Sequence, residues 1–217
     1  TTIYIAKQQT RTLGIIKNIL KKNKSKKIYS SQFSITKIKN YYLYKDQKHR
    51  IPIHPKKIYS KGLINNLALS IKIALDFGVS RRNIIKTVPK IQFEGRVQYL
   101  TKGKLKKLLK PKEKLLIDGC HSIASAKNLY DYLKTLKVPI YGIWGMKNNK
   151  SPELFLKTFK KVFKKIVTIN IPNEPNALKT KTLSNIAKSL NYETLNSFSV
   201  KDALLKISNN NKKVIVI

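Results

Sequence analysis

The chain has 217 residues, 41% of them hydrophobic, which is enough for one large domain or two small ones. No apolar run approaches the ~20 residues of a membrane span, and the first residues lack the apolar segment of a secretory signal. The single Cys120 excludes an internal disulfide and a cysteine-based metal site, so we expect a cytoplasmic protein. The net charge of +36 favours polyanions as partners.

The first part of the chain predicts a mixture of strands and helices. Leu13, Ile16, Ile19 and Leu20 fall on one helical face. β-Branched and aromatic residues between positions 28 and 44 favour strands with short turns. The expected helices are 10–20, 63–77 (ended by Gly78) and 80–88 (capped by Ser80 and closed by Pro89). The expected strands are 2–6 and those within 28–44, and the proline-interrupted segment 46–54 is an expected loop.

From about residue 93 the pattern changes to regular alternation of strand and helix. A glycine turn leads into a strand over 93–99. The other expected strands are 115–117, 140–142, 166–171, 194–198 and 214–217, and the expected helices are 123–136, 152–163, 182–190 and 200–207. Such alternation is typical of a doubly wound α/β sheet with helices on both faces. We therefore predict two domains, 1–92 and 93–217.

The segment 115–136 organises this second domain. Three apolar residues end in Asp118 and Gly119, which indicates a buried strand and a tight turn. Ser122 is a candidate N-cap for the helix that follows. Ligands in open α/β sheets bind at the carboxyl ends of strands, so Asp118 and His121 are candidate site residues. A turn-capping aspartate and a surface histidine are the structural alternative.

Four stretches together carry a resemblance. They are Gly95-Arg96-Val97-Gln98, Asp118 to Ser122, Gly145-Met146 through Lys150 to Pro152, and Ile171 to Leu178. In this order and spacing they resemble the carboxyl-terminal domain of bifunctional folylpolyglutamate synthase/dihydrofolate synthase, in the Mur ligase superfamily. The 63–77 helix, with Asn66, resembles the last long helix of that family's central ATPase domain. The resemblance implies a Rossmann-like carboxyl-terminal sheet preceded by the tail of that central domain.

The resemblance implies ATP-dependent amide ligation. ATP and Mg²⁺ would convert a carboxylate to an acyl phosphate, and glutamate would then attack dihydropteroate or folate activated in this way. By position, Arg96 and Asp118 would bind the nucleotide, since an arginine suits phosphates and a carboxylate suits ribose hydroxyls. His121 matches the family histidine beside the reacting groups, and Lys150 matches the lysine of the family's Lys-Asp pair, so both are candidate catalytic residues. Cys120 and Trp144 are more simply explained by packing, Trp144 as core or pocket wall.

The departures from the family are informative. Ser122 stands where the family has Asn, Ser151 stands where it has Asp, and a His-Gln pair before Asn66 is missing. No Gly-x-x-x-x-Gly-Lys-[Ser/Thr] loop occurs in the chain, although such a loop cradles the triphosphate. The metal ligands would also lie outside these residues. We expect the distal half of a ligase, inactive alone, working with a separately encoded amino-terminal half or surviving as a non-catalytic remnant.

The alternative function is that of a lysine-rich nucleic-acid-binding protein. Only five of the 46 basic residues are arginines, namely Arg11, Arg50, Arg81, Arg82 and Arg96. Arginine is the better residue for bidentate recognition of phosphates and bases. The lysines are spread along the whole chain, and abundant Lys, Asn and Ile are typical of AT-rich coding sequence. We expect nucleic acid to bind only non-specifically.

Overall fold

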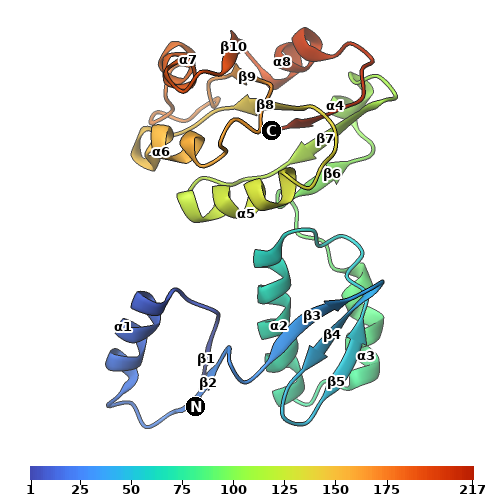
Figure 1. The fold of residues 1–217 in the computed structure, drawn as a ribbon, viewed down its shortest axis with the longest axis vertical. Coiled ribbons are helices and arrows are strands. Elements are labelled where there is room, and N and C mark those ends of the chain that lie inside the picture. The colour runs from blue at the N-terminus through green and yellow to red at the C-terminus, as the bar shows by residue number, and fades with distance from the viewer. The chain divides into compact units, whose positions relative to one another are not determined.

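The computed structural model describes all of residues 1–217, in two compact units, 1–92 and 93–217. Figure 1 shows the elements of each unit. The first unit contains β1 (Thr2–Ile5), α1 (Thr10–Leu20), β2 (Lys26–Tyr29), β3 (Ser34–Ile38), β4 (Tyr41–Lys45), β5 (Arg50–Ile53), α2 (Lys61–Asp76), α3 (Arg81–Thr87) and a 3₁₀ turn, Val88–Lys90. The strands β1 and β2 form a parallel pair, and β3, β4 and β5 form an antiparallel sheet in that order.

Helix α2 supplies much of the core of the first unit. Its N-cap is Ser60, whose hydroxyl accepts the backbone N–H of Leu63. The helix buries Ile64, Leu67, Ala68 and Ile71. Helix α3 is likewise capped by Ser80, as predicted. Helix α1, by contrast, has its predicted bounds but buries no residue, so its apolar side chains find no full partner within this unit.

The predicted loop 46–54 is wrong in part, because residues 50–53 form β5. Ile51 and Ile53 alternate with Pro52, and both isoleucines are fully buried. Pro52 lacks an N–H for a ladder, but β5 is the edge strand of its sheet, where proline is tolerated. Burial of the two isoleucines therefore prevailed over the proline signal.

The second unit is built on a six-stranded sheet in the order β10-β9-β8-β11-β7-β6. Its elements are β6 (Gln98–Leu100), α4 (Lys104–Lys107), β7 (Glu113–Ile117), α5 (Ile123–Leu133), β8 (Ile140–Trp144), a 3₁₀ turn (Asn148–Lys150), α6 (Pro152–Lys157), β9 (Lys165–Thr168), α7 (Thr180–Ser189), β10 (Glu193–Asn196), α8 (Val200–Ile207) and β11 (Lys213–Val216). All neighbouring strands are parallel except β6, which is antiparallel to β7. The predicted α/β sheet is confirmed.

Helices cover both faces of this sheet (Figure 1). Successive residues of a strand point to opposite faces. Leu116 therefore packs with α5, α6 and α7, and Leu115 packs with α8 and the region around α4. Strand β11 does the same with Val214 and Val216 on one face and Ile215 on the other. The near-continuous apolar runs of these strands are those of a parallel sheet buried on both faces.

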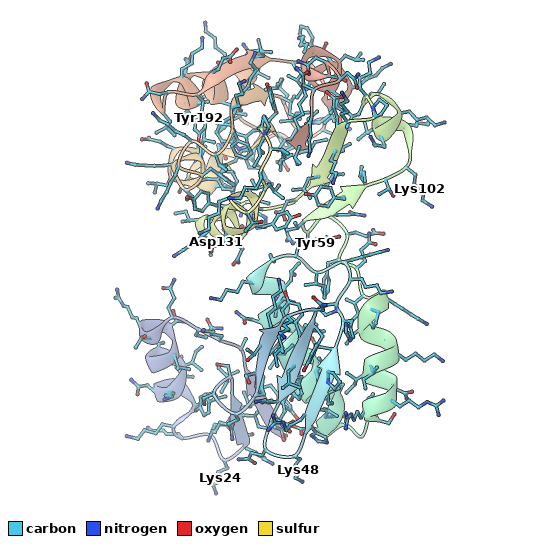
Figure 2. The ribbon with its side chains drawn as sticks, turned by 45° about the vertical axis from the view of Figure 1, so that its right-hand side comes forward. Lys24, Lys48, Tyr59, Lys102, Asp131 and Tyr192 are labelled. Atoms are coloured by element: carbon cyan, nitrogen blue, oxygen red, sulfur yellow. The ribbon has the colours of Figure 1, made fainter.

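The predicted helix 152–163 ends early, at Lys157. The Thr158 hydroxyl donates to the carbonyl of Leu154, and Lys160 and Lys161 have left-handed backbones. The hydroxyl of Tyr192, labelled in Figure 2, accepts the backbone N–H of Lys161 at 2.8 Å and holds this turn. Phe159 and Phe163 remain buried beyond the helix end. Apolar spacing thus gave the buried residues correctly but not the backbone.

The remaining differences between prediction and structure are small. Helix α5 ends at Leu133 rather than 136, β9 ends at Thr168 rather than 171, and the four-residue helix α4 was not predicted. Helix α8 has its predicted bounds. No helix in the structure combines the length and the apolar character needed to cross a membrane.

Candidate functional site

The turn that precedes β6 is joined to the turn that follows β7. The backbone N–H of Gly119 donates to the carbonyl of Gly95 at 2.7 Å. One carboxylate oxygen of Asp118 accepts the backbone N–H of Val97 at 2.8 Å, and the other accepts that of Cys120 at 2.9 Å. Residues 21 positions apart in sequence therefore form one structure at the carboxyl end of β7.

The backbone around Arg96 is strained, and Asp118 helps to hold it. Gly95 and Val97 both have left-handed backbones, with φ of 64° and 45°. Glycine adopts this conformation readily, but a β-branched residue does so rarely. Val97 is kept there by its buried side chain, which belongs to the core, and by its N–H bond to Asp118. Strain of this kind often occurs at functional sites.

The Arg96 guanidinium lies over Gly119. A Cβ added at Gly119 would sit 3.1 Å from Nη1 of Arg96, so a glycine is what lets the guanidinium approach the turn. Arg96 is exposed, and it forms no salt bridge with any carboxylate. A cation thus stands available beside a carboxylate at the edge of the sheet. The two residues predicted to bind the nucleotide therefore lie together at the carboxyl end of β7.

His121 lies at the start of α5 on the same rim. Its ring Nδ1 is 3.0 Å from the carbonyl of Gly119, so Nδ1–H donates and Nε2 is the acceptor nitrogen of the ring. The imidazole is exposed. Ser122 caps the helix in a reciprocal arrangement with Ser125, which confirms the predicted N-cap. The cap fixes the position of His121 relative to Gly119.

Lys150 is not brought into this cluster by any contact. It ends the 3₁₀ turn before Ser151, whose backbone is left-handed, and it makes no hydrogen bond or salt bridge to Arg96, Asp118 or His121. The neighbouring loop is nevertheless fixed. Lys147 forms a salt bridge with Glu174 at 2.8 Å, and the backbone of 146–148 is hydrogen-bonded to 176–178. Two of the four stretches that carry the resemblance, 145–152 and 171–178, are therefore held together.

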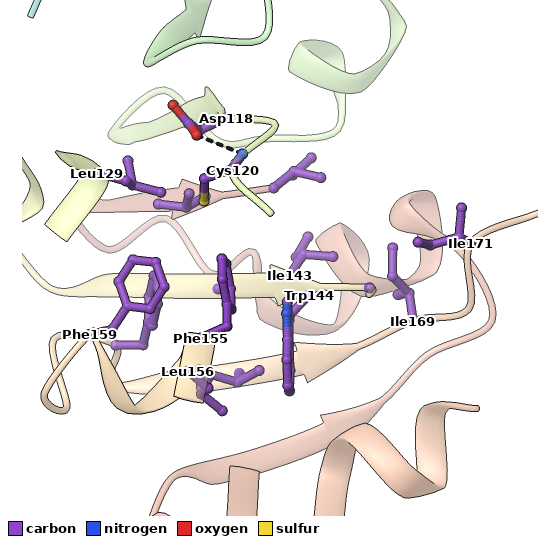
Figure 3. A pocket seen from close by; sticks show the side chains of 16 residues that line it. Asp118, Cys120, Leu129, Ile143, Trp144, Phe155, Leu156, Phe159, Ile169 and Ile171 are labelled. Carbon is purple, nitrogen blue, oxygen red and sulfur yellow. Dashed lines mark hydrogen bonds between the residues drawn. The ribbon is translucent and has the colours of Figure 1, made fainter. Parts of the chain in front are cut away.

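A cavity of about 230 Å³ begins beside Asp118 and Cys120 and extends between the sheet and helices α5 and α6 (Figure 3). Its lining is otherwise apolar, with aromatic rings from Trp144 and from 155–163. Sequence reasoning treated Trp144 as core or pocket wall, and Trp144 does line this cavity. Neither the cavity nor the hydrogen bond by which Asp118 holds the backbone of Val97 (the clamp on Val97) was predicted, since both depend on contacts between distant segments.

The Cys120 thiol is not suited to be a nucleophile. Burial, followed by the neighbouring charge of Asp118, raises the pKa of this thiol well above its usual range. The reactive form of cysteine is the thiolate. The thiol therefore stays protonated at neutral pH, in agreement with a packing role.

A magnesium ion, which the resemblance implies, finds no ligand cluster in these residues. No three His, Cys, Asp or Glu side chains gather where they could hold a metal ion. The chain has ten carboxylate residues in all, and Asp118 already accepts two backbone hydrogen bonds. No metal ligand is therefore assigned to a residue of this chain.

Solved structures share this fold. The Mycobacterium tuberculosis folylpolyglutamate synthase complexed with ADP matches with a TM-score of 0.79 and 14% identity, over 100% of this chain and 52% of that one. The Thermotoga maritima folylpolyglutamate synthase matches with a TM-score of 0.71 and 18% identity, over 98% of this chain and 50% of that one. E. coli FolC in complex with DHPP and ADP matches with a TM-score of 0.75 and 15% identity, over 94% of this chain and 47% of that one. The sequence matches no protein-family model and no curated protein.

These likenesses establish the fold of the chain. It is a mixed α/β fold found in folylpolyglutamate synthases, and the chain spans about half the length of those structures. At the level of fold, the resemblance drawn from the four sequence stretches is confirmed.

Proposed function

We propose that this chain is the distal half of an ATP-dependent amide ligase that adds glutamate to dihydropteroate or folates through an acyl phosphate. The observation that carries the proposal is the position of the Arg96 guanidinium over Gly119, beside Asp118, at the carboxyl end of β7. The solved structures that share this fold include Mycobacterium tuberculosis folylpolyglutamate synthase complexed with ADP and AMPPCP.

Each rim residue suits a role in that reaction. Arg96 presents several N–H donors and a fixed positive charge to the phosphates, and it would meet the charge that develops as the phosphoryl group is transferred. Asp118 retains acceptor capacity beyond its two backbone bonds, which suits ribose hydroxyls. The free Nε2 of His121 could accept a proton from the attacking amine. Lys150 has no hydrogen bond or salt bridge to these three residues, and its place in the proposal rests on its match to the family's lysine.

We further propose that activity requires a second polypeptide, which supplies the phosphate-binding loop and the metal ligands. Helix α1 has apolar side chains, including Ile15 and Ile19, that are more than half exposed. The β1–β2 pair that it connects consists of only two strands. A two-stranded parallel layer is marginal by itself. Further strands and helices supplied by a partner would complete this layer.

The proposed nucleotide binding by Arg96 and Asp118 can be tested on the chain alone by titrating ADP while recording ¹H–¹⁵N spectra. We expect weak binding that shifts the amide resonances of 95–97 and 119–122, because these groups surround Arg96 and Asp118. Arg96→Ala should weaken binding, since it removes the cation that faces the phosphates. Arg82→Ala, at an exposed position of the first unit, is the matched control and should leave the affinity unchanged. Shifts confined to other residues would contradict the assignment.

The requirement for a second half is tested by activity. The purified chain should not ligate glutamate to dihydropteroate or tetrahydrofolate in the presence of ATP and Mg²⁺. With a polypeptide that restores ligation, Arg96→Ala should lower kcat by about 100-fold with a smaller effect on the affinity for ATP, as for other groups that stabilise developing charge. Turnover by the 217 residues alone would overturn this part of the proposal.

A further inference from the structure

The apolar cavity of the second unit has a mouth and a closed end. The lining residues that are partly exposed are Asp118, Cys120, Gly145, Ile171 and Ile217, and all of them follow or end strands at the carboxyl edge of the sheet. The opposite end is formed by buried side chains, among them Phe159, which is labelled in Figure 3, and Phe163 and Ile166. The cavity is therefore entered from the strand ends and runs inward between the sheet and its helices.

The lining of the cavity includes one residue with an unsatisfied polar atom. Trp144 is 8% exposed, and its indole Nε1 is the one buried side-chain nitrogen or oxygen in the chain that has no hydrogen-bond partner. The indole N–H can only donate. Its ring is stacked on Phe155, with centroids 6.3 Å apart and planes 8° apart, so the indole is held in place by packing. A buried donor without an acceptor destabilises a protein by about 1–3 kcal/mol.

We propose that this cavity is a binding site for a small neutral molecule, one apolar ring in size, that carries a hydrogen-bond acceptor for the indole N–H of Trp144. The volume supports the size, because an apolar cavity of roughly 150 Å³ is enough to bind benzene and this one measures about 230 Å³. The lining supports the polarity, since twelve of its residues are Leu, Ile, Val, Phe or Trp. The indole N–H supports the acceptor.

Water is a poorer occupant than such a ligand. A buried water molecule normally makes about three hydrogen bonds. Apart from the indole N–H, the polar side chains of the lining are Asp118 and Cys120, which are at the mouth, and both Asp118 oxygens already accept backbone N–H groups. An ionised ligand is also disfavoured, because it would lose its hydration without gaining a partner of opposite charge. The proposal does not depend on the nucleotide role of Arg96.

The first test uses the wild-type chain, in which Trp144 is the only tryptophan and gives a single indole resonance in ¹H–¹⁵N spectra. The probes are acetophenone, a ring with one carbonyl acceptor, and ethylbenzene, which is similar in shape without the acceptor. We expect both to bind with saturable shifts. Acetophenone should move the indole proton downfield, as hydrogen bonding does, and ethylbenzene should not. If neither probe showed saturable binding, the proposal would be overturned.

The second test measures the same two dissociation constants in Trp144→Phe, which keeps a ring against Phe155 but removes the N–H. The ratio of the ethylbenzene Kd to the acetophenone Kd should fall about tenfold relative to wild type, because only acetophenone loses a partner. Comparing ratios cancels the difference in hydration of the two probes. An unchanged ratio would show that the indole does not contribute and would refute the acceptor requirement.

A pair of core variants locates the binding. Leu129→Phe places extra volume in the cavity and should weaken binding of both probes. Leu204→Phe makes the same change on the opposite face of the sheet, where Leu204 is fully buried away from the cavity, and should leave both affinities unchanged. Far-UV circular dichroism checks that both variants are folded. Equal loss in the two variants, or in neither, would contradict the location.

Discussion

Asp118 combines a proposed role in nucleotide binding with an observed role in holding the backbone. Its position at the end of a buried strand made it a candidate site residue, the family resemblance implied the nucleotide role, and the structure adds that it holds the backbone of Val97 and Cys120. The Val97 bond matters most, since it keeps a β-branched residue in a left-handed conformation that costs about 1–2 kcal/mol. The carboxylate thereby positions Arg96, which lies between the two left-handed residues Gly95 and Val97.

We predict that Asp118→Ala destabilises the chain by about 2 kcal/mol, because two backbone donors lose a charged acceptor. The amide protons of Val97 and Cys120 should exchange faster with solvent. Urea unfolding and hydrogen exchange measure the two effects. This stability measurement also separates a direct effect of Asp118→Ala on nucleotide binding from loosening of the turn.

Asp131→Ala is the control for this prediction. Asp131, labelled in Figure 2, forms a salt bridge with Lys134 in which both side chains are about half exposed. Such pairs contribute little, so the change in stability should stay below about 1 kcal/mol. If Asp118→Ala were as mild as Asp131→Ala, the clamp on Val97 would not be a significant stabilising element.

The sequence predicted that Arg96, Asp118 and His121 lie at one rim but not how they interact. It also predicted Lys150, which no hydrogen bond or salt bridge joins to them. The strand, turn and helix over 115–136 follow from local spacing and from the cap at Ser122, so Asp118 and His121 could be placed at a strand end. The bond from Val97 to Asp118 joins distant segments, and no local pattern encodes it. The unsatisfied Trp144 Nε1 likewise depends on side chains from several elements that line one cavity.

At the scale of elements, strand β11 is the member that holds the sheet together. It is last in sequence but lies between β7 and β8, pairing with both. At its start, Lys213 is 2% exposed and lies 3.3 Å from Glu113 of β7, which is also buried. Glu113 further accepts hydrogen bonds from Ser208, Asn209 and the backbone of Lys110. A buried ionic network thus connects β7, β11 and the end of α8.

We predict that Glu113→Gln destabilises the chain by about 3 kcal/mol at neutral pH, since it leaves Lys213 buried without its counter-charge. Glu193→Gln is the matched control on the same sheet. Glu193 pairs with Lys165 at 2.5 Å, but its side chain is 61% exposed, so that change should be below about 1 kcal/mol. Urea unfolding of both variants at one pH makes the comparison, and equal effects would argue against the importance of the buried network.

The same network predicts that the stability of the folded chain depends on pH. Burial alone would raise the pKa of Glu113, but its hydrogen bonds outweigh this effect and the pKa lies below the ordinary value of 4.5. Between the two values the unfolded chain binds more protons than the folded chain, so stability rises with pH there. The contribution of Glu113 is therefore complete above pH 4.5 and is lost as the pH falls through the folded value. Glu113→Gln should show a shallower loss of stability in acid.

Element prediction succeeded where local signals agreed and failed where tertiary contacts decided. Helix α8 has a serine cap at Ser199 and regular apolar spacing, and its bounds were correct. Strand β5 was missed because proline was taken as a loop signal, although burial of Ile51 and Ile53 decides that segment. Helix α6 was predicted too long because Phe159 and Phe163 keep helical spacing past its end. The central place of β11 cannot be read from any local window.

For the whole molecule, the charge of +36 is a property of the surface rather than of the site. Lys24, Lys48 and Lys102, labelled in Figure 2, are exposed and extend away from the ribbon, and they come from three separate loops. Only one of the five arginines, Arg96, lies at the candidate site. A scattered cationic surface of this kind attracts polyanions through counterion release and does not select a sequence.

We therefore predict that the chain binds duplex DNA at low salt and loses roughly 10³-fold or more in affinity between 50 and 200 mM salt. Two unrelated duplexes of equal length should bind equally at each salt concentration, as measured by fluorescence anisotropy. Arg96→Ala should hardly change this binding, because it removes one of 46 positive charges, whereas it should weaken the binding of ADP. The two assays thus separate surface charge from the rim of the sheet. A sequence-selective complex that survives physiological salt would instead favour a nucleic-acid function over the ligase.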